Sequence, residues 1–106
     1  MSKTSPTQRS LAKLRGEGWK VEVVERWNPH SRTRKDLWGF VDLIAIRNGE
    51  LLAVQTTSYS NISSRVNKIQ ESDMVALVRS CNIGIHVHGW KKNKSGRWEC
   101  TVRDIS

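Results

Sequence analysis

The pattern of hydrophobic and polar positions centres on two apolar segments joined by Asn48-Gly49. Residues 39–57 read GFVDLIAIRNGELLAVQTT. Asn-Gly is the pair that best fits a two-residue type I′ turn, because both central residues must adopt φ > 0. The segment therefore predicts a tight β-hairpin, and the almost wholly apolar first strand predicts that this hairpin lies inside a sheet covered on both faces.

A tight turn also fixes which residues face each other across the hairpin. Counting back from the turn pairs Arg47 with Glu50, Ile46 with Leu51, Ile44 with Ala53, and Asp42 with Gln55. Directly opposed side chains point to the same face with Cβ atoms about 5 Å apart. Asp42 and Gln55 are therefore predicted neighbours, and Thr57 follows on their face because side chains alternate with period two. Burial of an unpaired carboxylate is costly, so an acid beside an amide on buried strands needs an explanation. Metal binding is one such explanation.

Before the hairpin, the sequence predicts a helix, a strand and a loop. Residues 5–8, Ser-Pro-Thr-Gln, form a capping box for a helix that runs to about Arg15 and ends at Gly16. Residues 19–27, WKVEVVERW, alternate as a half-exposed strand. Residues 28–35 contain Pro, Ser, Thr and Arg without periodicity and are predicted to be a loop.

After the hairpin, the pattern predicts a helix and two strands. Apolar residues recur at near-helical spacing from about residue 62 to residue 79. Residues 83–90 then read as a strand, residues 91–96 as a lysine-rich turn, and residues 97–103 as a final alternating strand. The order is helix, three strands, helix, two strands (αβββαββ), which predicts an α/β fold with a mixed central β-sheet flanked by helices.

The length of 106 residues indicates one domain spanning residues 1–106, with residues 1–4 as a frayed start. No apolar run approaches the roughly 20 residues of a membrane span, and the first residues do not resemble a signal sequence. We therefore expect a protein with no membrane partner, located in the cytoplasm, or in the host cytoplasm if it is phage-encoded. Cys81 and Cys100 lack metal-type spacing and are predicted to be buried free thiols.

Charge adds a candidate partner. Eighteen Lys and Arg against ten Asp and Glu give a formal net charge of +8, which is typical of proteins that bind polyanions. The cations cluster on both sides of the central hairpin: Arg32, Arg34 and Lys35 precede it, and Lys91, Lys92 and Lys94 lie near the end. Each cluster alone could be a solvated loop, but together they indicate contacts with a nucleic-acid backbone. Trp27 and Trp38 could stack on bases, whereas Trp19, Trp90 and Trp98 are predicted core residues.

Several candidate site residues have two readings. Glu25 continues the apolar face of its strand, so it is either an acid of the site or a solvated residue beyond the edge of the core. His86 and His88 form an H-x-H pair that either binds a metal or consists of two solvated or stacking imidazoles. Asp42 is either a metal ligand or a strand acid neutralised by Arg65 or Lys68, and Gln55 is either a site residue or a satisfied core amide.

The element order, with an acid in the central hairpin, resembles the core of the PD-(D/E)xK, or restriction-endonuclease-like, nuclease superfamily. It is most similar to the small Holliday-junction-resolvase-like and phage-type branches. The resemblance is carried by GFVDLIAI, by LLAVQTT, and by SNISSRVNKI, which follows where the family places its second core helix. The chain departs from the motif because Gln55 stands in place of the usual acid and Thr57 in place of the lysine. The helical glutamate of the resolvases also has no counterpart, since Gln8 and Arg9 occupy the comparable positions.

The resemblance implies a role for each residue of the motif. Asp42, Gln55 and the backbone carbonyl of Thr56 would hold Mg²⁺ (or Mn²⁺), with Glu25 or Asp36 as the second acid. Thr57 occupies the position of the catalytic lysine, and Lys68 or Arg65 could reach in as its substitute.

The implied function is metal-dependent endonuclease cleavage of DNA, including branched or structured DNA. Related resolvases are commonly dimers, so a homodimer is compatible with the resemblance, although no stretch identifies an interface. Two rival functions remain open from the sequence: a DNA-binding module that keeps the nuclease fold without cleavage, and a basic RNA- or protein-binding adaptor.

Overall fold

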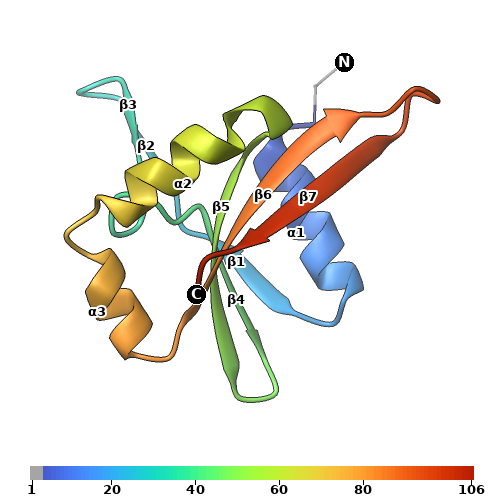
Figure 1. The fold of residues 1–106 in the computed structure, drawn as a ribbon. Helices are drawn as coiled ribbons and strands as arrows, with labels where there is room; N and C mark the ends of the chain where they lie inside the picture. Colours follow the sequence, from blue (N-terminus) through green and yellow to red (C-terminus); the bar gives the residue numbers. More distant parts are fainter. Residues whose placement is uncertain (1–3) are drawn as a thin grey trace.

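A mixed five-stranded sheet, in the order β1-β4-β5-β6-β7, lies at the centre of the molecule (Figure 1). The computed structural model describes residues 4–106. Strands β5 and β6 run parallel, and the other neighbouring pairs are antiparallel. The elements are α1 (Pro6–Gly16), β1 (Lys20–Val23), β2 (Arg26–Asn28), β3 (Thr33–Lys35), β4 (Leu43–Arg47), β5 (Glu50–Ser58), the 3₁₀ turn η1 (Tyr59–Asn61), α2 (Ile62–Gln70), α3 (Val75–Ser80), β6 (Gly84–Lys92) and β7 (Trp98–Asp104). The predicted single-domain α/β fold with a mixed sheet and helices is confirmed.

The predicted hairpin forms with the predicted register. Arg47 pairs with Glu50 and Ile44 with Ala53, and both turn residues have positive φ, 47° at Asn48 and 81° at Gly49. Just before β4, the Asp42 N–H donates to the carbonyl of Val54 at 2.9 Å. The pairing therefore continues to the point where Asp42 lies beside β5.

Helices cover both faces of the sheet. Helix α1 packs on one face, where its Leu11 and Leu14 meet Trp19, Leu43 and other apolar residues of β1, β4 and β5. Helices α2 and α3 cover the other face, over a second core that includes Ile69, Val78, Ile85 and Val87. The covering of both faces explains why β4 and β5 are apolar on both sides. Within residues 4–106, no helix is long and apolar enough to cross a membrane.

Two predicted elements are interrupted. The predicted helix 62–79 divides into α2 and α3, because Ser72 accepts a hydrogen bond from the Met74 N–H at 3.1 Å and so replaces a helical contact with a side-chain turn. The predicted strand 19–27 stops at Val23, which is exposed although it lies on the same face of the strand as the buried Val21.

The predicted loop 28–35 is also wrong in part, because β2 and β3 form a separate antiparallel hairpin. Asn28 closes the turn between them by accepting hydrogen bonds from the N–H groups of His30 and Ser31. Strand β2 therefore pairs with β3 and not with the main sheet. This small hairpin projects beside α2 (Figure 1).

Some single-residue predictions need correction as well. Cys81 and Cys100 are free, as predicted, but Cys81 is exposed and Cys100 half-buried. Trp98 is 42 % exposed and not a core residue, because it lies on the outer strand β7, where Arg9 covers its ring at 3.9 Å. The expectation of a frayed start at residues 1–4 falls, for residues 1–3, outside the described residues, and Thr4 is exposed.

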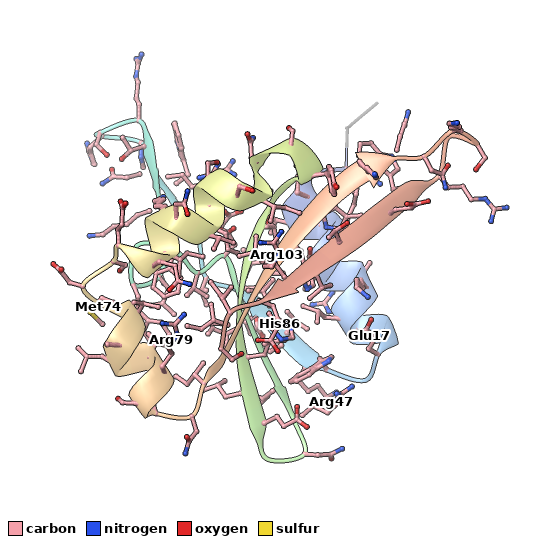
Figure 2. All side chains as sticks on the ribbon, viewed as in Figure 1. Glu17, Arg47, Met74, Arg79, His86 and Arg103 are labelled. Carbon is pink, nitrogen blue, oxygen red and sulfur yellow. The ribbon has the colours of Figure 1, made fainter. Side chains whose placement is uncertain are left out.

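The two histidines of the H-x-H pair have separate environments. His88 is buried, and its Nδ1 is 2.9 Å from the Ser10 Oγ of α1, which also accepts a hydrogen bond from the Trp90 Nε1–H. Burial lowers the pKa of His88 to about 4, so the ring is neutral near pH 7. The ring of His86, labelled in Figure 2, instead has its Nε2 3.5 Å from the Asp104 Oδ2. His88 is therefore a structural contact between α1 and β6, and the prediction of two solvated or stacking rings is wrong for it.

Gly89 is a point of close approach between β6 and the segment that covers it. A Cβ at this position would collide with the buried side chain of Ile62 and lie 3.1 Å from the Tyr59 Cα. We expect Gly89→Ala to destabilise the fold by about 2 kcal/mol, as overpacking of a core does. Urea unfolding checks this, with Gly16→Ala as the control, because nothing lies within 4 Å of that added Cβ. Equal free energies of unfolding for wild type and Gly89→Ala would contradict the packing argument.

Candidate metal site

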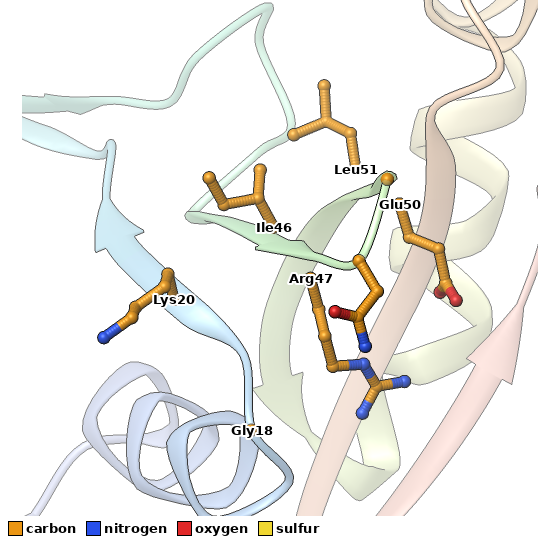
Figure 3. A pocket seen from close by; sticks show the side chains of 8 residues that line it. Gly18, Lys20, Ile46, Arg47, Glu50 and Leu51 are labelled. Carbon is orange, nitrogen blue, oxygen red and sulfur yellow. The ribbon is translucent and has the colours of Figure 1, made fainter.

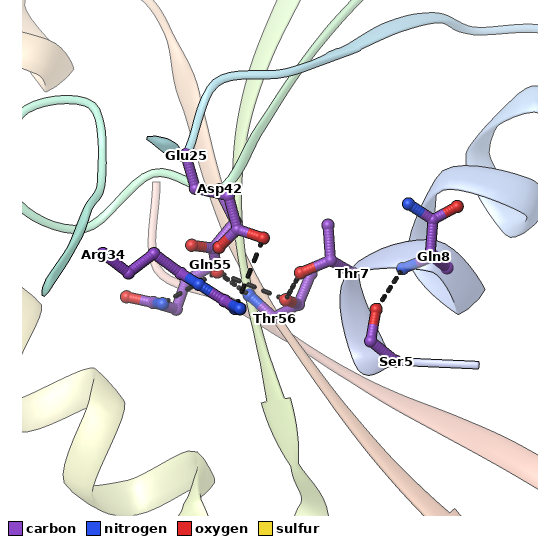
Figure 4. A network of polar contacts seen from close by, with 8 residues as sticks. All are labelled: Ser5, Thr7, Gln8, Glu25, Arg34, Asp42, Gln55 and Thr56. Atoms are coloured by element: carbon purple, nitrogen blue, oxygen red, sulfur yellow. Dashed lines mark hydrogen bonds and ion pairs between the residues drawn. The ribbon is translucent and has the colours of Figure 1, made fainter. Parts of the chain in front are cut away.

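Asp42 is the centre of a polar network at the start of β4. Its Oδ2 accepts hydrogen bonds from the Gln55 Nε2 at 2.9 Å, the Thr56 backbone N–H at 2.8 Å and the Thr56 Oγ1 at 3.2 Å (Figure 4). The side chain is only 3 % exposed. All three bonds end on Oδ2, so they fix the orientation of the carboxylate without occupying Oδ1.

Helix α1 supports this network through Thr7. The Oγ1 atoms of Thr7 and Thr56 lie 2.8 Å apart, and both side chains are buried. The single hydroxyl proton of Thr56 is donated to Asp42, so Thr7 is the donor to Thr56. A chain of hydrogen bonds thus runs from the first turn of α1 to Asp42, and Thr7 occupies the place on α1 that faces the site.

Two further carboxylates meet Asp42. Oxygen atoms of Glu25, Asp36 and Asp42 lie within 4.8 Å of one another. Glu25 lies between β1 and β2, and Asp36 directly follows β3, so the small hairpin brings both acids to the start of β4. The sequence presented Glu25 and Asp36 as alternative second acids, and the structure brings both together with Asp42.

Burial and the charge of a neighbouring carboxylate raise the pKa of two of these acids, Asp36 and Asp42. Desolvation, followed by the charge of Asp42, raises the pKa of Asp36 to about 6. Desolvation is also the largest cause that raises the pKa of Asp42, and the hydrogen bond from the Thr56 backbone opposes it. Asp36 and Asp42 therefore disfavour their charged forms, which a bound cation would favour.

Gln55 contributes an unused oxygen. The residue is 3 % exposed, and its Oε1 is buried without a hydrogen-bond partner among the described residues. The amide orientation follows from the Asp42 carboxylate, which accepts from Nε2 and would repel Oε1 in the same place. A buried carbonyl oxygen without a partner costs about 1–3 kcal/mol, and coordination of a cation would remove that cost.

Cations line the same pocket, which has a volume of about 280 Å³. Arg65 and Lys68 reach it from α2, and Arg34 reaches it from β3, where its guanidinium lies 3.6 Å from the Glu25 carboxylate. Arg65 and Lys68 both lower the pKa of Asp36, against the larger effect of burial. The pocket thus combines three clustered acids with three cations.

A larger hollow, of about 580 Å³, lies beside the turn between β4 and β5 (Figure 3). It is lined by Ile46, Leu51, Lys20, Arg47 and one carboxylate, that of Glu50. The Arg47 guanidinium is already engaged by the Glu17 carbonyl at 2.7 Å and by the Trp19 ring. This hollow lacks the clustered oxygens of the Asp42 pocket, so we place the candidate chemistry at Asp42.

The structure brings most, but not all, of the predicted site residues together. Eight of them line one pocket: Glu25, Arg34, Asp36, Asp42, Gln55, Thr56, Arg65 and Lys68. Thr57 lies on the same face of β5 but outside that lining, buried two residues beyond Gln55.

Four of the remaining predicted cations lie at the two projecting ends of the molecule. Arg32 is exposed at the tip of the small hairpin, whereas Lys91, Lys92 and Lys94 lie at the end of β6 and in the following turn. Lys35, the last of the set, lies at the base of the small hairpin. Lys91 packs over the Tyr59 ring at 4.2 Å.

Asp36→Asn is expected to stabilise the protein at neutral pH, by about 1 kcal/mol once solvent screening is allowed for. The pKa of Asp36 in the folded protein, about 6, exceeds the ordinary value of 3.8, so ionised Asp36 destabilises the fold. This destabilisation is fully present above about pH 6 and disappears below about pH 4. Thermal unfolding at pH 7.5 and pH 3.5 checks this. A gain of equal size at both pH values would contradict the electrostatic cause.

Comparison with models of known protein families gives no match, and neither the curated protein sequences nor the solved structures give a significant match.

Proposed function

We propose that the protein is a metal-dependent DNA endonuclease that hydrolyses phosphodiester bonds at the Asp42 pocket. The observation that carries the proposal is the buried Gln55 Oε1, which lacks a partner and lines the same pocket as three clustered carboxylates. A set of acids alone is common on protein surfaces. The additional buried oxygen without a partner supports a site that is completed by a cation.

The donor atoms fit a hard divalent cation. Carboxylate and amide oxygens are the ligands that Mg²⁺ prefers, with several water molecules retained, and Mn²⁺ accepts the same ligands. Asp42, Glu25, Asp36 and Gln55 would hold the ion. When bound, it would supply Lewis-acid polarisation of the phosphate and a lower pKa for an attacking water.

The remaining side chains of the pocket would position the DNA. Arg65 and Lys68 can bind phosphate oxygens and stabilise the negative charge that develops on them during hydrolysis. Thr7 and Thr56 keep Asp42 in one orientation, so they are positioning residues. In this proposal Lys68 replaces the lysine that the motif lacks at Thr57.

Sheet topology also supports a restriction-endonuclease-like core. The antiparallel strands β1, β4 and β5 are followed by a helical crossover to the parallel strand β6. This is the arrangement that the PD-(D/E)xK resemblance implies, with the small β2–β3 hairpin as an insertion. We propose the same core here, in a protein that acts on DNA in the cytoplasm.

Metal dependence tests the proposed function. Purified protein is incubated with single-stranded, duplex and four-way DNA in Mg²⁺, in Mn²⁺ and in EDTA, and binding of Mn²⁺ is measured by calorimetry. We expect cleavage of at least one substrate in either metal, none in EDTA, and saturable Mn²⁺ binding. No cleavage of any substrate, or cleavage that persists in EDTA, would reject this proposal.

A DNA-binding module without cleavage is the second candidate, and the charge of the pocket favours it. Three cations, Arg34, Arg65 and Lys68, line the pocket with the three acids, so its formal charge is balanced without a metal. Calorimetry and binding assays distinguish the two candidates. DNA binding without saturable Mn²⁺ binding or cleavage supports the module, whereas Mn²⁺ binding that is lost in Asp42→Asn supports the enzyme.

The basic clusters give a prediction that both candidates share. Arg34 already pairs with Glu25, whereas Arg32 and Lys35 are exposed and have no ion pair among the described residues. Replacing Arg32 and Lys35 by alanine should therefore flatten the slope of log affinity against log salt by about two units for duplex DNA. Titrations across a series of salt concentrations measure the slope. An unchanged slope would place the phosphate contacts elsewhere.

A further inference from the structure

A second cavity, of about 440 Å³, adjoins the acidic pocket through Asp36, which lines both. Its apolar lining comes from Val23 and Val24, at the end of β1, and from Leu37 and Trp38, in the turn after β3. Arg26 and Lys35 are paired residues at the base of the small hairpin, and they supply two cations. The cavity lies within the size range of small-ligand sites.

The lining combines an apolar slot with positive charge. Val23 is 41 % exposed, and Trp38 is half-buried, so apolar surface remains open to a ligand. Trp38 adopts φ of 56°, which is unfavourable for a bulky residue by roughly 1–2 kcal/mol, and Gly39 follows with φ of 84°. The turn thus holds an aromatic ring beside Asp36 at a cost in backbone energy.

These features match the parts of one nucleotide. A nucleobase is flat and aromatic and stacks on Trp side chains, while the phosphates on either side of it carry negative charge. Arg26 and Lys35 would attract those phosphates, and a neighbouring phosphate would lie in the adjoining pocket. An apolar peptide would leave both cations without partners. A base inside a duplex is stacked and paired, so it reaches such a slot only from a single-stranded or opened segment.

We propose that this cavity binds one unpaired nucleobase next to the phosphodiester bond that lies at Asp42. The inference rests on the proposed function and deepens it, because it names the substrate class as single-stranded or locally opened DNA. The base occupies the slot lined by the two valines and Trp38. Arg26 and Lys35 contact the phosphates on either side of that base. Asp36 lies between the base and the reacting phosphate.

The test uses short fluorescein-labelled single strands, one with all bases and a series with a single abasic site moved along the strand. The affinity of the protein for each strand is measured by fluorescence anisotropy, with Ca²⁺ in the buffer in place of Mg²⁺ or Mn²⁺. We expect one abasic position to weaken binding by the wild type by about tenfold, the size of one stacking contact. Val23→Trp, which fills the slot from an exposed position, should remove this difference. Ile46→Trp should keep it, since Ile46 is 53 % exposed at the far hairpin.

Trp38 gives a second readout. Trp38→Phe retains an aromatic ring and should keep most of the discrimination, whereas Trp38→Leu should lose it while circular dichroism still reports a folded protein. Equal affinity for the intact strand and for every abasic strand would overturn this inference and leave the proposed nuclease standing. Discrimination without cleavage would retain the base site and reject catalysis. Binding of no oligonucleotide would overturn both.

Discussion

Replacing Asp42 by asparagine is expected to lower the rate of DNA cleavage by a factor of about 10³ or more, with little loss of DNA affinity. Asp42 is the carboxylate around which the site is built, and its uncharged amide would no longer hold the cation together with Glu25 and Asp36. A metal ion supplies several kcal/mol of transition-state stabilisation, and each 1.36 kcal/mol or so corresponds to a tenfold change in rate. Arg34, Arg65 and Lys68, which also line the pocket, are unchanged.

Asparagine is the informative replacement because it can preserve the local structure. Its side-chain oxygen can still accept from the Thr56 N–H, whereas alanine would leave the donors of Gln55 and Thr56 without their acceptor. Asp73→Asn is the matched control, since Asp73 is an exposed acid between α2 and α3. If Asp42→Asn and Asp73→Asn cleaved DNA at the wild-type rate, the reacting phosphate would not lie at Asp42.

The centre of the site could be predicted from sequence because its determinants are local. Asn48-Gly49 permits one tight turn, and strand alternation then places Asp42 beside Gln55. Arg65 and Lys68 reach the pocket together because a helix places residues three apart on one side, so their spacing is also a local signal. The mixed sheet follows from the same periodicities, which are strongest in the elements that are buried on both faces.

The rest of the site depends on tertiary contacts that leave no periodic signal. Glu25 and Asp36 lie in short connections, and they meet because residues 26–28 pair with residues 33–35 and not with the main sheet. Val24 still contacts the main sheet, since its N–H donates to the Asp42 carbonyl, and the separate hairpin begins two residues later at Arg26. A three-residue strand alternates too briefly to be recognised, so the segment read as an unpaired loop.

Thr7 shows the same limit on the other side of the site. Its position in the first turn of a capped helix was evident, but the face that it presents depends on how α1 packs against the sheet. Leu11 and Leu14 define that packing, and they place Thr7 over Thr56 at the start of the helix. The first turn of a helix is usually exposed, so the sequence gives no signal that Thr7 is buried there.

Stability and function oppose each other at this pocket. Burial raises the pKa of Asp36 and of Asp42, and Gln55 keeps an oxygen buried without a partner among the described residues. Both features destabilise the protein without a ligand, and no described residue donates a hydrogen bond to the Gln55 Oε1. A fold selected for stability alone would remove them with an apolar or amide substitution, so their presence together supports a site that is completed by binding.

Lys68→Ala is expected to reduce cleavage by about 10²- to 10³-fold while weakening DNA binding by less than about threefold. Lys68 is exposed on α2 and lines the acid pocket, so it can meet negative charge that develops on the reacting phosphate. The loss of one such donor has this effect on the rate when the contact is made mainly in the transition state.

Single-turnover rates and binding affinities, measured on the same DNA, separate the two roles of Lys68. Lys20→Ala is the matched control, because Lys20 is an exposed lysine on β1 outside the acid pocket. Arg65→Ala should weaken binding more than Lys68→Ala does, if Arg65 holds a phosphate in the ground state as well. A Lys68→Ala protein that loses affinity and turnover in equal proportion would make Lys68 an ordinary phosphate contact. The lysine absent at Thr57 would then have no replacement at Lys68, and Arg65 would be the other candidate on α2 for that role.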